Sequence, residues 1–201
     1  MVDFFVQGGG FMWPILIALL FGLAIIGERA YSLLNASSNT DQFFEDVKTI
    51  YSDSGKEQAI ELCENTPGPV ASIFYAGLSK MGNAKEEIEK AVQNAGGLEM
   101  AFLEKNMIWI NSVITIAPML GFTGTVVGMI KAFEDIKMAN DISPAVVAGG
   151  ISQALLTTAF GLIVAMIMQV AQNFFVSMID KLILDMEEQS IKIVEYLHSS
   201  K

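Results

Sequence analysis

Three long stretches without a charged residue constrain this 201-residue chain more than any other feature. They cover residues 4–27, 106–130 and 142–179, which are 24, 25 and 38 positions long. A membrane-spanning helix needs about 20 consecutive apolar residues, whereas an average helix of a soluble protein has about 11 or 12 residues in all. All 12 basic and 22 acidic side chains lie in the remaining positions. The chain is therefore predicted to be an all-α membrane protein with three transmembrane helices.

The three windows and their flanks divide the chain into seven predicted segments. These are a periplasmic amphipathic segment (1–10), a first span (11–30), a cytoplasmic helical domain (31–105), a second span (106–133), a periplasmic loop (134–143), a third span (144–179) and a cytoplasmic C-terminal helix (180–201). Ten of the twelve basic residues lie in 28–105 and 180–201. The positive-inside rule places those residues in the cytoplasm and the N-terminus outside.

The second and third helices are predicted to extend beyond the membrane into the cytoplasmic domain. The third window alone would form a helix about 57 Å long, against a hydrocarbon core of about 30 Å. Asn83 with Glu86 has the spacing of a capping box and predicts a helix that runs toward the second span, as Asn39 with Gln42 predicts an earlier one. If Gly96-Gly97 is tolerated within it, one rod of about 50 residues enters the membrane.

The rest of the composition excludes several functional classes. One cysteine, Cys63, and one histidine, His198, give no disulfide framework and no metal site of the Cys or His type. A net charge of −10 argues against a nucleic-acid partner. The sequence contains no nucleophile–base pair, metal-ligand cluster or phosphate-binding loop, so we expect neither catalysis nor a cofactor.

The third span has one polar and one apolar half. On a helical wheel the small and polar residues share one side. They are Gly150, Gln153, Thr157, Thr158, Gly161, Ala165, Gln169 and Gln172. For any single threonine, packing is the commoner role, but the face as a whole favours a lined pore or a groove for a partner helix.

The second span has a similar face, with a proline inside it. Its members are Asn111, Thr115, Pro118, Gly121, Thr125 and Gly128. Gly124 and Gly128 form a GxxxG motif, which permits close approach of another helix. Pro118 is expected to kink the helix.

No window contains Asp, Glu, Lys, Arg, His, Cys or Tyr. Proton transfer by side-chain titration needs an ionisable group inside the membrane. If the chain helps to conduct protons, the titrating carboxylate must therefore come from a partner that lies against the polar face.

Two motifs resemble those of the ExbB/TolQ/MotA proton-channel family. The second-span motif is similar to Ala117-Pro-Met-Leu-Gly-Phe-Thr-Gly-Thr-Val-Val-Gly-Met-Ile130 followed by Ala132-Phe133, and the third-span motif to residues 150–165. Glu28-Arg29 at the end of the first span also matches. Three spans, rather than the four of MotA, resemble the ExbB/TolQ branch.

The resemblance implies a pentamer in a Gram-negative inner membrane, in contact with lipids. Its pore would hold the single spans of two ExbD- or TolR-like subunits, whose aspartates titrate, and the complex would act on a TonB- or TolA-like protein. The pore threonines of the family correspond to Thr125 and Thr158. The glutamate that the family has before Ala-Leu in the third span is Gln153 here, for which a lining role is expected instead of proton transfer.

The resulting hypothesis assigns three groups of residues. The proton pathway is predicted to be lined by Thr125, Thr158, Thr157, Gln153, Thr115 and Asn111. Helix packing is assigned to Gly121, Gly124, Gly128, Pro118, Gly150 and Gly161. The charges at the membrane interface are Glu28 and Arg29, which either anchor the first span at the headgroups or pair across subunits.

Several alternatives remain open at this point. An ExbB-like subunit serves TonB-dependent transport, whereas a TolQ-like subunit serves outer-membrane integrity and cell division. The ion could be a proton or a sodium ion. A membrane scaffold that conducts nothing would have the same fold and the same oligomer, while a membrane enzyme is disfavoured because no reactive constellation exists.

Overall fold

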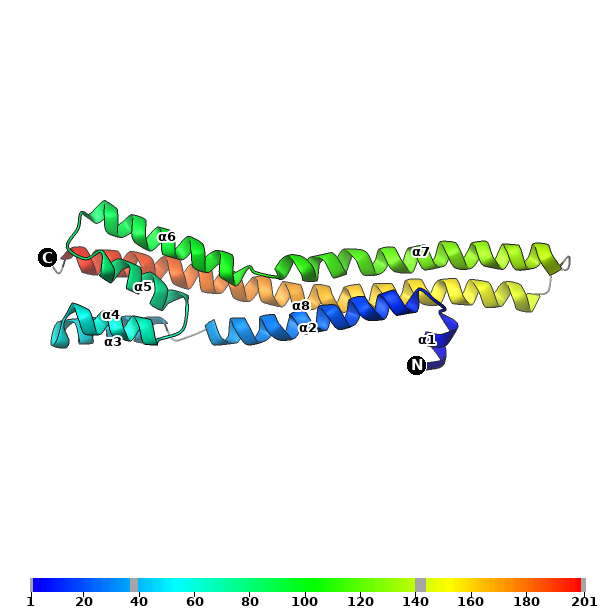
Figure 1. The fold of residues 1–201 in the computed structure, drawn as a ribbon, viewed down its shortest axis with the longest axis horizontal. Coiled ribbons are helices and arrows are strands. Elements are labelled where there is room, and N and C mark those ends of the chain that lie inside the picture. Colours follow the sequence, from blue (N-terminus) through cyan, green and yellow to red (C-terminus); the bar gives the residue numbers. More distant parts are fainter. Residues whose placement is uncertain (1, 37–39, 140–143, 200–201) are drawn as a thin grey trace. The chain divides into compact units, whose positions relative to one another are not determined.

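The computed structural model describes residues 2–36, 40–139 and 144–199, and the regular structure in these ranges is all helical (Figure 1). The helices are α1 (Val2–Gln7), α2 (Met12–Ala36), α3 (Thr40–Ser54), α4 (Lys56–Asn65), α5 (Pro69–Ser79), α6 (Lys85–Leu103), α7 (Met107–Ala139) and α8 (Pro144–Ser199). Three helical stretches, which are α2, α7 with the preceding α6, and α8, are long and apolar enough to cross a membrane. The fold class predicted from the charge-free windows is confirmed.

The helix that leads into the second span is interrupted, although its glycines are tolerated. Gly96 and Gly97 lie inside α6, as the prediction of a continuous rod required. The chain instead breaks at Asn106, which has a φ of 66°. Asparagine tolerates this left-handed conformation better than most residues, and the Asn106 carbonyl accepts the first hydrogen bond of α7 from the Trp109 N–H at 3.1 Å. The single rod of about 50 residues is therefore wrong.

The start predicted for the third span is observed, whereas the helix start predicted at Asn83 is not. Pro144 is the first residue of α8, as its fixed φ favours. The box at Asn83 is wrong, because Ala84 is the N-cap of α6 and the Asn83 side chain donates to Glu87 Oε2 at 2.6 Å. The other box begins at Asn39, which lies outside the described residues.

The chain divides into two compact units, which we describe separately. The first, called the apolar unit, comprises Met1–Glu28 and Asn106–Phe174. It contains α1, most of α2, α7 and the first half of α8. Here α7 and α8 run antiparallel (Figure 1). Glycines of each helix lie against the backbone of the other.

The second, called the charged unit, comprises Arg29–Lys105 and Phe175–Lys201. Its core contains Phe74 and Leu78 of α5 with Ile193 and Leu197 of α8, all at most 1% exposed. Phe43 of α3 stacks on Phe74 with ring centroids 5.6 Å apart. This unit folds around α5, because burial of its apolar side chains on several faces removes them from water.

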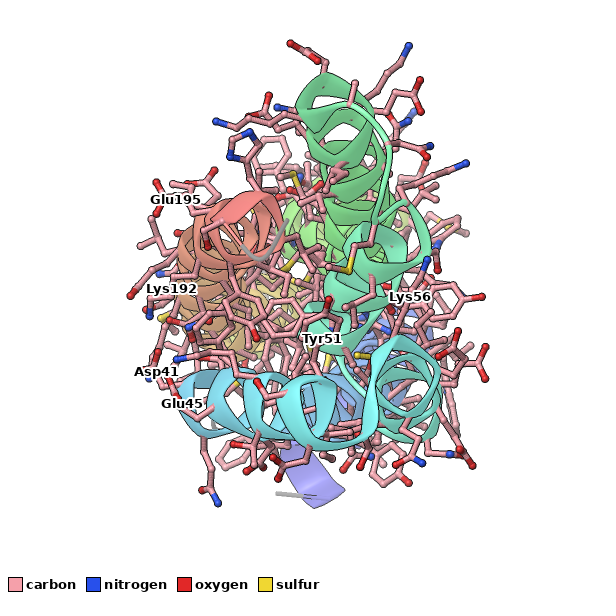
Figure 2. The ribbon with its side chains drawn as sticks, turned by 90° about the vertical axis from the view of Figure 1, so that its left-hand side faces the viewer. Asp41, Glu45, Tyr51, Lys56, Lys192 and Glu195 are labelled. Carbon is pink, nitrogen blue, oxygen red and sulfur yellow. The ribbon has the colours of Figure 1, made fainter. Side chains whose placement is uncertain are left out.

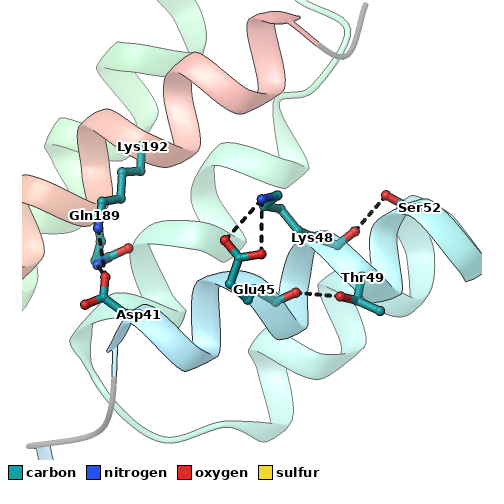
Figure 3. A network of polar contacts seen from close by, with 7 residues as sticks. All are labelled: Asp41, Glu45, Lys48, Thr49, Ser52, Gln189 and Lys192. Carbon is teal, nitrogen blue, oxygen red and sulfur yellow. Dashed lines mark hydrogen bonds and ion pairs between the residues drawn. The ribbon is translucent and has the colours of Figure 1, made fainter.

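A polar contact joins α3 to α8 at the surface of the charged unit. Asp41 accepts hydrogen bonds from Lys192 Nζ and Gln189 Nε2, both at 2.8 Å, and the labelled Asp41 and Lys192 lie side by side (Figure 2, Figure 3). Lys192 first, and then Gln189, lowers the pKa of the Asp41 carboxyl. The hydrogen bond from Lys192 to Asp41 in turn raises the pKa of Lys192. On the same helix as Asp41, Glu45 pairs with Lys48 at 3.1 Å (Figure 3).

Candidate functional site in the apolar unit

Two threonine hydroxyls from different helices meet in the apolar unit. Thr125 of α7 and Thr158 of α8 are hydrogen-bonded to each other through their side-chain oxygens, and both side chains are half-buried. Thr125 Oγ1 lies 2.9 Å from the Ala154 carbonyl oxygen, and Thr158 Oγ1 lies 3.1 Å from that of Gly121. We call these two residues the threonine pair. Because each hydroxyl donates once and accepts twice, the pair can keep its mutual bond and still accept a hydrogen bond from water or a partner.

Glycines bring the two helices close enough for this contact. A Cβ on Gly121 would lie 2.9 Å from the Thr157 carbonyl oxygen, and a Cβ on Gly161 would lie 2.5 Å from that of Ala117. Real side-chain carbons do not approach backbone atoms so closely. The small residues therefore allow the backbone approach that places one threonine against the other, as in other membrane helix pairs.

The remaining predicted packing glycines also lie against a facing helix. A Cβ on Gly128 would be 3.1 Å from the Cβ of Ala154. A Cβ on Gly150 would collide with Ala132. These contacts continue the α7–α8 interface on one side of the threonine pair, in the direction away from Gly161.

The other two predicted lining residues of α8 have different surroundings. Thr157 is 1% exposed and donates to the Ala154 carbonyl oxygen at 2.7 Å. A Cβ on Gly124 would lie 2.7 Å from the Thr157 hydroxyl. Gln153 is half-buried against the turn between α1 and α2, since a Cβ on Gly9 would collide with its amide nitrogen. Within one chain, Thr157 is thus a packing residue, and Gln153 contacts the N-terminal turn.

The structure does not bring Asn111 and Thr115 to the threonine pair. Both side chains are exposed on α7, where the Thr115 hydroxyl donates to the Asn111 carbonyl oxygen at 3.1 Å. They precede Thr125 by fourteen and ten residues, or about 21 and 15 Å of helix. Pro118 lies between them and Thr125, inside α7, where it cannot donate to the carbonyl one turn earlier.

Site prediction from the sequence missed one polar pair. Gln169 Nε2 donates to Asn173 Oδ1 at 2.9 Å, and both side chains are exposed on α8. Asn173 was not singled out because an ideal wheel places it about 40° beyond Gln169, among apolar residues. The i, i+4 spacing of two amides was the available signal.

Glu28 and Arg29, adjacent on α2, make different contacts. Glu28 Oε2 accepts a hydrogen bond from Asn106 Nδ2 at 3.2 Å, within the apolar unit. Arg29, in the charged unit, is 1% exposed, and its Nη1 lies 3.4 Å from the Leu103 carbonyl oxygen and 3.5 Å from that of Phe102. These carbonyls end α6, where a cation is favoured by the helix dipole. Within a single chain the buried guanidinium therefore stabilises the C-terminal end of α6.

The chemistry of the threonine pair is that of a neutral hydrogen-bonding station. Threonine hydroxyls donate and accept but do not ionise at physiological pH. Within the described ranges, no group of three His, Cys, Asp or Glu residues is placed to hold a metal ion. The pair can therefore hold water or stabilise a charge on another group, but it cannot itself carry a proton as a charged species.

Comparison with known proteins gives the same family as the motifs. A model of the MotA/TolQ/ExbB proton channel family matches residues 65–188. The ExbB-like 3 protein of Synechocystis sp. is 30% identical over 173 residues, which cover 85% of this chain and 82% of that protein.

Relatives with two different names are found at lower identity. The biopolymer transport protein exbB1 of Vibrio cholerae is 26% identical over 79% of this chain and 72% of its own length. The Tol-Pal system protein TolQ of Pseudomonas aeruginosa is 26% identical over 75% of this chain and 70% of its own length. The family match covers more than half of the chain and both threonines of the pair, and the chain belongs to the MotA/TolQ/ExbB proton channel family.

Proposed function

We propose that this chain is the channel-forming subunit of an inner-membrane complex that couples the proton motive force to TonB-dependent transport across the outer membrane. The observation that carries the proposal is the threonine pair, two half-buried hydroxyls in a chain whose three charge-free windows contain no ionisable side chain. Membership of a proton channel family supports conduction as the activity.

In this proposal the titrating carboxylate belongs to a partner. A carboxylate that enters the membrane opposite the threonine pair accepts hydrogen bonds when ionised and donates one when protonated. Hydroxyls that donate to the ionised carboxylate lower the cost of its charge in a medium of low dielectric constant. The role of the pair is thus to position and stabilise, while the partner transfers the proton.

The assembly that fits this role is a pentamer around the single spans of two ExbD- or TolR-like subunits. Large apolar side chains remain exposed on α7 and α8 in the single chain, among them Phe122, Leu155 and Val170. Lipids and neighbouring helices would cover them. The basic residues favour a periplasmic N-terminus and a cytoplasmic charged unit.

Two systems fit the family match, one that uses an ExbB-like subunit and one that uses a TolQ-like subunit. Proteins named exbB1 and TolQ match this chain at the same identity, 26%. We favour ExbB because the relative at 30% identity carries that name. A TolQ-like role, with TolA in place of TonB, is the alternative, and the partner that co-purifies with the chain distinguishes the two.

Substitution of the threonine pair tests the proposal. Thr158→Val and Thr125→Val keep the side-chain shape and remove the hydroxyl, so the complex should assemble but lose energy coupling. Thr123→Val is the matched control, since its exposed hydroxyl on the same helix donates only to the Met119 carbonyl oxygen at 2.8 Å.

The assay is proton uptake into liposomes that contain the co-expressed complex, with size-exclusion chromatography to verify assembly. We expect uptake to be lost in both variants of the pair and unchanged in the control. Uptake at the wild-type rate in Thr158→Val and Thr125→Val would show that the pair has no part in conduction. Uptake absent from the wild-type complex as well would favour the non-conducting scaffold.

A further inference from the structure

We propose that Asn111, Gln169 and Asn173 form a second hydrogen-bonding layer that faces water in the assembled protein. We call these three residues the amide layer. The proposal rests on the proposed function and extends it, because the layer would hold the water that links the threonine pair to the aqueous phase on the side of Glu28 and Asn106. No residue of the layer contacts the threonine pair.

Asn111 and Gln169 lie at one level of the apolar unit, and Asn173 lies about one helical turn further along α8. A Cβ on Gly22 of α2 would touch Met168 of α8 at 2.5 Å and Val113 of α7 at 3.5 Å, so these two residues share a level. Asn111 is two residues from Val113 and Gln169 is one residue from Met168. At 1.5 Å of rise per residue, the two amides are within about 5 Å of each other in height.

The layer also continues the face on which the threonine pair lies. Eleven residues separate Thr158 from Gln169, which is about 16 Å of rise and about 20° of rotation on an ideal helix. Fourteen residues separate Thr125 from Asn111, which is about 40° of rotation. The same stripe on each helix therefore passes from a half-buried hydroxyl to an exposed amide.

The chemistry of the layer requires a polar neighbour. A side-chain amide has two donors and an acceptor with two lone pairs, and the Gln169–Asn173 bond occupies only one position of each group. Transfer of an amide from water into hydrocarbon is unfavourable when its hydrogen bonds are not replaced. Water on this face satisfies the free positions of the two exposed amides, Gln169 and Asn173.

A neutral layer suits a path for protons better than a charged one. Amides hydrogen-bond to water without ionising, so they hold a water chain without trapping a proton. A carboxylate at the same position would bind the proton and a lysine would repel it. The layer therefore positions water by hydrogen bonds, while the carboxylate of the partner titrates.

Depth in the membrane would hydrate these residues even without an aqueous path. The experiment therefore has to separate hydration caused by depth from hydration of one face of α8. Side chains close to the headgroups meet water on every face of a helix. Val170 and Ile167 bracket Gln169 in depth and are 71% and 45% exposed. An ideal helix places them about 100° and 160° away from Gln169 around the axis, which makes them matched controls.

The test is thiol labelling of the complete complex in membranes. Gln169→Cys, Asn173→Cys, Val170→Cys and Ile167→Cys are each made in a Cys63→Ala background and treated with the charged reagent 2-sulfonatoethyl methanethiosulfonate. A thiol in an apolar environment has a raised pKa, and each unit of pKa removes about nine-tenths of the reactive thiolate. We expect the two amide positions to react at least about tenfold faster than the two controls.

Two labelling results would overturn the proposal. Equal rates at all four positions would mean that interfacial depth alone hydrates this part of α8. Slow reaction at both amide positions would mean that lipid or protein covers the face. Labelling does not depend on conduction, so it separates failure of this inference from failure of the proposed function.

A flux measurement tests the link to conduction. The double variant Gln169→Leu, Asn173→Leu should lower proton uptake into liposomes several-fold, whereas Val170→Leu should leave it unchanged. Size-exclusion chromatography verifies that both variants assemble with the partner. Unchanged uptake in the double leucine variant would overturn the role of the amide layer in the path, even if the thiols react rapidly.

Discussion

Gly161→Ala would add a single carbon where the backbones of α7 and α8 lie close together. That carbon would lie 2.5 Å from the Ala117 carbonyl oxygen and 3.2 Å from the Gly121 Cα, and both of these are backbone atoms that cannot rotate away. To reach an ordinary contact of 3.4 Å the two helices must separate by nearly 1 Å at this level. Overpacking of this kind costs about 1–3 kcal/mol.

The separation also reaches the threonine pair. Thr158 Oγ1 is 3.1 Å from the Gly121 carbonyl oxygen, so a shift of that size takes the distance past the limit of a hydrogen bond, about 3.2 Å for a good one. We therefore expect Gly161→Ala to lower the unfolding temperature in detergent and to reduce proton uptake in the same protein. A stability loss without a flux loss would mean that the glycine serves packing alone.

Gly149→Ala is the matched control on the same helix. A Cβ at that position meets nothing within 4 Å, and alanine is favoured over glycine in a helix by about 1 kcal/mol. The control should be as stable as the wild type or slightly more stable, with normal uptake. If Gly161→Ala behaved like Gly149→Ala in both assays, the argument from helix approach would be refuted.

Three further predictions concern the charged unit: its buried arginine, its Asp41–Lys192 pair and its cysteine. Arg29→Met should destabilise the protein by about 1–3 kcal/mol, measured by thermal unfolding, because the terminal carbonyls of α6 lose a charged donor. Asp41 has a lowered pKa in the folded state, so its contribution to stability is present above its unfolded pKa of 3.8 and is lost as the pH falls through the lower folded value; an Asp41→Asn variant should lack this part of the acid dependence. Lys192 has a raised pKa, so its contribution is present below 10.5 and is lost as the pH rises through the higher folded value, which an alkaline titration of unfolding detects. Burial raises the pKa of Cys63 to about 12, so mass spectrometry should find it unmodified by thiol reagents at neutral pH until the protein unfolds.

The spans could be predicted from the sequence because a helix that crosses the bilayer needs about 20 consecutive apolar residues. A charge-free run of 24 residues is about twice the length of an average helix in a soluble protein, and all three windows lie largely in helices. The break at Asn106 had no comparable signal, since neither glycine nor proline marks it. Its left-handed conformation is accompanied by a hydrogen bond to Glu28, a residue 78 positions earlier in the chain.

The candidate site could be predicted from the sequence only in part. The motifs identified Thr125 and Thr158, and periodicity placed them on polar faces, but no sequence pattern gives the rotation of one helix against another. Thr157 shows the consequence, because it is adjacent to Thr158 and yet turned into the α7–α8 interface at 1% exposure. The burial of Arg29 could not be predicted either, because the residues that surround it, at the end of α6, come from more than 70 positions away.

Proton uptake by three reconstituted samples tests the central claim that the chain lines the path while another protein carries the proton. The samples are this chain alone, the chain with its co-purifying single-span partner, and the same complex with the intramembrane carboxylate of the partner changed to its amide. Only the second sample should conduct. Uptake by the chain alone at the rate of the complex would contradict the account, since its charge-free windows hold no residue that could titrate.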